Sequence, residues 1–226
     1  MRILAVDTSS ERGSICVHDA GQAIAEIRLA SSMQYAEQLF RSLEFLFKSL
    51  PFTLAEIDMF VAARGPGSFT GLRVGLAAME GFAAAYGKPC GGVSTLQALA
   101  WKTGIHETLL APMMDARREE VYGSLCRLSR RPGEELIEER APIVLKPAQW
   151  FSSLPDEKLV FCGDGAIRYR SMIEENRKWS IHPMDLYLAG AIAELALMPA
   201  CGPLEPLYIR KTDAEIAREG IASPNP

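Results

Sequence analysis

Two aspartates stand where short apolar runs end, and their surroundings are suited to phosphate chemistry. Asp7 is followed by the hydroxyl residues Thr8 and Ser9, and Asp115 ends a similar run in the second half of the chain. An aspartate at the carboxyl end of a strand, beside hydroxyls and backbone N–H groups, can serve phosphate groups and Mg²⁺. Asp also commonly caps a turn by hydrogen-bonding its own backbone. The sequence therefore predicts either a nucleotide cleft lined by Asp7, Thr8, Ser9 and Asp115, or two capped turns.

The residues next to both aspartates favour the capped turns. The first turn continues with Ser10 and lacks the glycine that lets a backbone wrap closely around a phosphate. The second turn carries the bulky residues Arg117 and Arg118.

The segment Gly65–Gly75 is the most unusual in the chain. It reads GPGSFTGLRVG, which matches neither the Walker loop nor the dinucleotide-binding glycine pattern. Its order predicts a strand that leaves through a sharp turn into a helix capped by Ser68 or Thr70. Free N–H groups at such a helix start favour anions, whereas small residues also allow close packing. Both interpretations remain open from the sequence.

Metal-ligand and nucleophile patterns are missing from the sequence. The three histidines, His18, His106 and His182, are isolated from one another, and no Cys/His cluster has ligand spacing. No Gly-x-Ser-x-Gly elbow occurs. The five cysteines are widely spaced, which is typical of reduced thiols in a cytosolic protein. We therefore expect no metal and a cytoplasmic location.

The charge and hydropathy of the sequence argue against binding nucleic acid unaided and against a membrane span. The net charge of −4 is spread evenly, without the basic face that a stand-alone RNA-binding protein usually shows. Contact with nucleic acid is thus expected only through a partner. The apolar run at the start of the sequence is too short for the core of a signal peptide, and no apolar run is long enough to span a membrane.

The order of predicted elements is duplicated. Strands at 3–6, 14–18 and 24–29 precede a helix at 34–50, a strand at 57–63, a helix at 70–86, a strand at 90–93 and a helix from about 94. The second half repeats it with strands at 109–114, 120–128, 136–145 and 159–162 and helices at 147–154, 168–177 and 186–198. This repeat predicts an α/β protein with a two-lobed actin-like ATPase (ASKHA, ribonuclease H-like) fold, with lobes at 1–107 and 108–226. A single doubly wound sheet is the alternative, although three opening strands without helices argue against it.

The two long helices of the first half are apolar over more than one stripe. One lobe has a single sheet face to cover both, so we expect an exposed helix-to-helix interface with another subunit. The candidate interface residues are Phe40, Leu43, Phe47, Leu72, Leu76 and Met79.

Four segments together resemble the TsaB (YeaZ) family. They are 3–9, 64–75, 115–122 and 206–210, and the resemblance covers nearly the whole chain in order. It implies an actin-like fold and a non-catalytic role beside the paralogue TsaD and the ATPase TsaE, in making threonylcarbamoyladenosine on tRNA. When that partner is absent, the apolar surface of the two long helices is expected to pair with a second copy of the chain in a homodimer.

The resemblance assigns residues and cofactors as well. Its motif loop comprises Gly65, Pro66, Gly67, Ser68, Thr70, Gly71 and Arg73. No cofactor is expected on this chain alone, and ATP or ADP with Mg²⁺ remain candidates for the complex. The family's first helix often carries His-Ser-Glu where this chain has Gln34-Tyr35-Ala36-Glu37, so partner contacts there are expected to differ. The family has an older description as a protease, but this sequence contains no nucleophile–base arrangement that would support it.

The alternative function is a stand-alone ASKHA-type nucleotide-dependent transferase or kinase. The poor phosphate turn and the missing metal ligands count against it.

Overall fold

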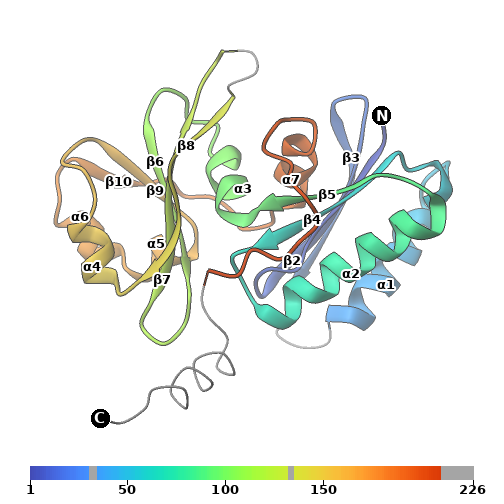
Figure 1. Cartoon of the computed structure of the whole chain (residues 1–226), viewed down its shortest axis with the longest axis horizontal. Coiled ribbons are helices and arrows are strands. Elements are labelled where there is room, and N and C mark those ends of the chain that lie inside the picture. Colours follow the sequence, from blue (N-terminus) through green and yellow to red (C-terminus); the bar gives the residue numbers. More distant parts are fainter. Residues whose placement is uncertain (31–34, 132–134, 210–226) are drawn as a thin grey trace, which may run out of the picture.

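The computed structural model describes residues 1–30, 35–131 and 135–209 and contains two five-stranded mixed sheets (Figure 1). The first sheet has the order β3-β2-β1-β4-β5. Its strands are β1 (Ile3–Asp7), β2 (Arg12–Asp19), β3 (Gln22–Ala30), β4 (Met59–Gly65) and β5 (Cys90–Ser94). The second sheet has the order β10-β9-β6-β7-β8. Its strands are β6 (Leu109–Asp115), β7 (Val121–Leu128), β8 (Leu136–Leu145), β9 (Leu159–Cys162) and β10 (Trp179–Ile181).

The two sheets repeat one pairing scheme. Strand β1 pairs antiparallel with β2 and parallel with β4, and β6 pairs antiparallel with β7 and parallel with β9. Each sheet thus has three antiparallel strands that are extended by parallel ones, and this repeated unit is the predicted duplication. The two-lobed actin-like ATPase fold is therefore confirmed.

The helices form an outer layer and an inner layer around the first sheet (Figure 1). Helices α1 (Tyr35–Lys48) and α2 (Phe69–Tyr86) lie side by side on its outer face. Helices α3 (Thr95–Lys102) and α7 (Ala189–Leu195) lie between the two sheets. The short helices α4 (Pro147–Ser152), α5 (Asp164–Arg168) and α6 (Arg170–Glu174) belong to the second lobe.

The last helix returns to the first lobe. Helix α7 contacts β1 and β2, and the backbone N–H of Ala189 donates a 2.9 Å hydrogen bond to Ser14 Oγ of β2. The division at residues 107 and 108 remains a prediction, and the contacts of α7 show that residues after it complete the core of the first sheet.

Most predicted elements are present within one or two residues of their expected bounds, and local signals explain the ends of α2. Ser68 caps its start by accepting a 3.3 Å hydrogen bond from the Gly71 N–H, and Gly87 ends it with a left-handed φ of 62°. The predicted helix 168–177 is present as the shorter α6, and α5, which ends just before it, was not predicted. Strand β10 and a short 3-10 helix at Leu54–Glu56 were not predicted, because three-residue elements carry too little periodicity. Gln34, at the expected start of the first helix, lies outside the described residues.

None of the described helices is long and apolar enough to cross a membrane.

Candidate functional site

The first aspartate lies in the core and not on an open surface. Asp7 is fully buried at the end of β1, and its Oδ1 accepts a 2.9 Å hydrogen bond from the Ser9 N–H. Its Oδ2 is buried and accepts no hydrogen bond from the described residues. Burial raises the pKa of the Asp7 carboxyl to about 6, although the hydrogen bonds from Ser9 and the charge of Lys102 act in the opposite direction. An anionic Asp7 is therefore costly in this position.

The glycine-rich segment packs directly onto the turn that follows Asp7. A methyl group added at Gly67 would collide with the Ser9 backbone, and one at Gly71 with the Thr8 carbonyl. Thr8 Oγ1 donates a 2.7 Å hydrogen bond to the Gly71 carbonyl, and the Ser68 N–H donates one of 2.7 Å to the Ser9 carbonyl. These glycines let α2 approach the turn closely, and two N–H groups at the helix start are already bonded within the chain.

The second aspartate is held by arginines. Arg168 Nη1 donates a 2.7 Å hydrogen bond to Asp115 Oδ2, and Arg117 Nη1 lies 3.8 Å from the same oxygen. Arg117 Nη2 also reaches Glu11 Oε1 at 2.6 Å, which joins the turns that follow β1 and β6. The Asp115 carboxylate is thus neutralised by this chain's own guanidinium groups. Among these partners, Arg168 and Glu11 were not predicted, because each lies on a different element from the residue it contacts.

The candidate nucleotide residues therefore do not fit a nucleotide and Mg²⁺ in this chain alone. The structure joins the two aspartate turns through Glu11 and Arg117, but it buries Asp7, Thr8 and Ser9. Within the described ranges, no three His, Cys, Asp or Glu side chains group together as metal ligands.

Four of the six predicted interface residues are core residues, which corrects the sequence prediction. Leu43, Leu72, Leu76 and Met79 are at most 6% exposed. The prediction assumed that one sheet face cannot cover two helices, whereas a five-stranded sheet is wide enough to bury a stripe of both (Figure 1). Phe47 is half-buried and packs edge-on against Phe52. Phe40 is 50% exposed and is the one predicted residue that presents a large apolar surface.

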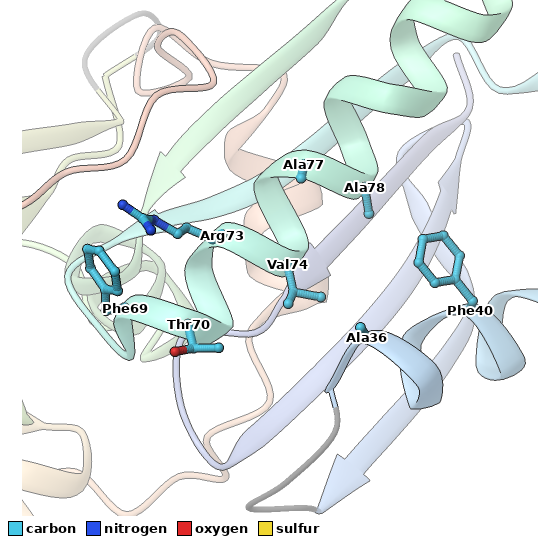
Figure 2. A pocket seen from close by; sticks show the side chains of 8 residues that line it. All are labelled: Ala36, Phe40, Phe69, Thr70, Arg73, Val74, Ala77 and Ala78. Atoms are coloured by element: carbon cyan, nitrogen blue, oxygen red, sulfur yellow. The ribbon is translucent and has the colours of Figure 1, made fainter.

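An apolar groove lies between α1 and α2 instead (Figure 2). It has a volume of about 480 Å³. Its lining residues are Ala36, Phe40, Phe69, Thr70, Arg73, Val74, Ala77 and Ala78. Phe40 forms one wall from α1, and Val74 and Ala77 form the other from α2. The sequence signal for this groove is the pair of small residues Ala77 and Ala78 on α2, which the sequence prediction of the interface did not include.

The comparisons with known proteins agree with this architecture. Residues 28–198 match the family described as "TsaD: tRNA N6-adenosine threonylcarbamoyltransferase". The chain is 27% identical to the tRNA threonylcarbamoyladenosine biosynthesis protein TsaB of Bacillus subtilis, over 77% of this chain and 76% of that protein. It is 35% identical to the Escherichia coli protein of the same name, over 54% and 53% of the two chains.

Solved structures also match the fold of this chain. A Pseudomonas aeruginosa protein described as having similarity to peptidase YEAZ superposes with a TM-score of 0.78 at 25% identity, covering 92% of this chain and 99% of that one. The structure described as YeaZ from the same organism superposes with a TM-score of 0.76 at 23% identity, with the same coverage.

Proposed function

The chain belongs to the TsaD family of tRNA N6-adenosine threonylcarbamoyltransferases, and from this premise we propose that it is a non-catalytic subunit that pairs with a separate TsaD protein. Its TsaB relatives support involvement in tRNA threonylcarbamoyladenosine biosynthesis. The ATPase TsaE is the further partner in the proposal.

The state of the two aspartates supports the non-catalytic role. Asp115 is paired with Arg168 and Arg117, so a metal ion would have to displace a guanidinium that lies 2.7 Å away. Asp7 would have to become exposed from a fully buried position before its carboxylate could reach a metal ion. The chain therefore lacks the open pair of carboxylates that a phosphate-transferring member of this fold would use.

The groove between α1 and α2 is the observation that carries the pairing proposal. It combines an exposed aromatic wall, Phe40, with small residues on α2 that permit close approach of another helix. Contiguous exposed apolar surface on a protein is a mark of interaction sites and binding grooves. ATP or ADP with Mg²⁺, in this proposal, are bound only in the assembled complex.

Two measurements test the proposal together. The complex mass of an equimolar mixture with purified TsaD, determined by light scattering, should equal the sum of the two chains. Steady-state ATP hydrolysis by this chain alone should remain at background, and it should rise only when the partners are added. A chain that hydrolyses ATP unaided at an enzymatic rate would instead support the stand-alone transferase or kinase.

A matched pair of variants locates the pairing surface. Ala77→Arg places a long charged side chain in the groove, whereas Ala148→Arg makes the same change on the exposed surface of α4 in the second lobe. The first should abolish the complex and the second should leave it intact, with unchanged melting temperatures for both. Equal binding by both variants would show that the partner docks elsewhere.

A further inference from the structure

Three side chains form a compact, exposed cluster at one end of the groove. The Arg73 guanidinium lies 3.8 Å from the centroid of the Phe69 ring, and its Nε donates a 3.1 Å hydrogen bond to the Tyr208 hydroxyl. The rings of Phe69 and Tyr208 are 5.2 Å apart. Arg73 and Phe69 lie together at the start of α2, beyond Val74 and Ala77 (Figure 2). Stacking and the hydrogen bond fix the orientation of the guanidinium before any ligand arrives.

Tyr208 reaches this cluster on a segment that is bonded to the first sheet. Gly202 exchanges two backbone hydrogen bonds of 2.9 and 3.0 Å with Gly92 of β5, and the Leu207 N–H donates one of 2.7 Å to the carbonyl of Arg64. The chain is therefore anchored to the first sheet at Leu207, immediately before Tyr208, the residue that holds Arg73. Tyr208 is a positioning residue for Arg73.

The outer edge of the guanidinium has no acceptor in the described chain. Neither Nη1 nor Nη2 of Arg73 donates to any residue in the ranges 1–30, 35–131 and 135–209, and no carboxylate there lies within ion-pair distance. An arginine fork held in one orientation matches the two oxygens of a carboxylate, which it can bind through two parallel N–H···O bonds.

We propose that Phe69, Arg73 and Tyr208 form a preformed receiving site for a carboxylate, and that its occupant is an Asp or Glu side chain on a helix of the docking protein. This inference rests on the proposed function for the location of the docking surface. The same helix fills the adjoining groove with small apolar side chains against Val74 and Ala77.

The surroundings of Arg73 favour a protein carboxylate over a phosphate of RNA. The groove beside it is apolar, and the exposed Glu80 lies two turns further along the same stripe of α2. A phosphate chain following this surface would meet that like charge, whereas a helix can offer one carboxylate at Arg73 and apolar residues beyond it. At 1.5 Å per residue, the groove from Thr70 to Ala78 extends for about 12 Å, which is roughly two turns of a partner helix.

Titration calorimetry with purified TsaD tests the site. Arg73→Gln should weaken binding by about tenfold or more, since it removes one member of a charge-assisted pair at an interface. Tyr208→Phe keeps the ring and loses only the hydroxyl, so its effect should be about two- to tenfold. Arg177→Gln, the same change at an exposed position of the second lobe, is the control and should leave the dissociation constant unchanged. Unchanged binding by Arg73→Gln would overturn the proposal.

A crosslinking experiment identifies the occupant directly. Arg73→Lys introduces a primary amine, which a carbodiimide joins only to a carboxylate in contact with it. Mass spectrometry of the crosslinked complex should show residue 73 joined to an Asp or Glu of TsaD. A complex that forms normally and gives no such crosslink would contradict the proposed occupant.

The groove variant separates this inference from the proposed function. If Ala77→Arg abolishes the complex while Arg73→Gln does not weaken it, the docking surface stands and the carboxylate site is wrong. If neither variant has an effect, both proposals fail. If Arg73→Gln spares protein binding but lowers the affinity of the assembled complex for tRNA, the anion is a phosphate and the proposal is overturned.

Discussion

The turn after β1 and the turn after β6 occupy equivalent places in the two lobes, yet they stabilise their aspartates in opposite ways. In the first lobe, Asp7 is fully buried, and α2 packs its glycines against Thr8 and Ser9. In the second lobe, Asp115 keeps a partly exposed carboxylate, which two arginines neutralise. Duplication therefore preserved the backbone scheme, while the side chains diverged from the shared cleft chemistry that the sequence pattern suggested.

The difference supports the proposed role of a subunit. The first turn has become a structural support for α2, and α2 forms one wall of the exposed groove. The second turn has become a bridge to the first through Arg117 and Glu11. Four predictions test how far these two turns differ.

The largest effect is expected from Leu76→Glu, which tests whether α2 is the buried support of the first turn. Leu76 is 6% exposed in the core of the first lobe, so a glutamate there would bury an unpaired charge. We expect a loss of roughly 4 kcal/mol or more in the free energy of unfolding, measured by urea denaturation. Phe40→Glu, at a half-exposed position of the neighbouring helix, should change that free energy much less. Similar values for both variants would show that α2 does not bury this side chain.

Next is Gly71→Ala, which tests the close contact between α2 and Thr8. The added methyl group would meet the Thr8 carbonyl, so we expect a destabilisation of about 3 kcal/mol. Gly81 of the same helix has open space at its Cβ, and Gly81→Ala should instead stabilise the protein by about 0.5–1 kcal/mol. Opposite signs for these two identical substitutions are the expected result in urea denaturation.

The pH dependence of stability tests the burial of Asp7. Its pKa is raised from 3.8 to about 6 in the folded protein, so the folded state binds the proton more tightly than the unfolded state does. The contribution of Asp7 to the free energy of unfolding is therefore fully present below pH 4 and is lost as the pH rises through about 6. By linkage, this contribution amounts to about 3 kcal/mol. Asp7→Asn should remove this part of the pH profile, and the variant should gain stability relative to the wild type between pH 4 and pH 7. Parallel profiles would mean that Asp7 is accessible to water.

The smallest effect is expected from Glu11→Gln, which breaks the bridge between the two turns. Glu11 and Arg117 are both more than 60% exposed, and exposed ion pairs contribute about 0.2–1 kcal/mol. We expect a change within that range in urea denaturation, decreasing further in high salt. A loss of several kcal/mol would instead show that the bridge holds the two lobes together.

The sequence by itself determined the elements and their order. Ser68 and Thr70 marked the start of α2 as its two candidate caps, and the repeated strand pattern identified a duplicated fold. These signals act between residues that are neighbours in the chain, so they can be interpreted without knowing the rest of the molecule.

Only the tertiary structure decided which side chains are buried and which ones contact each other across different elements. Leu72 and Leu76 look equally suited to a core or to an interface by periodicity, and the width of the first sheet determines that they are buried. The partners of Asp115 and Arg73 lie 53 and 135 residues away, at Arg168 and Tyr208. Local pattern carries no information about such pairs, because they form only when the return of the chain from the second lobe to the first places them side by side.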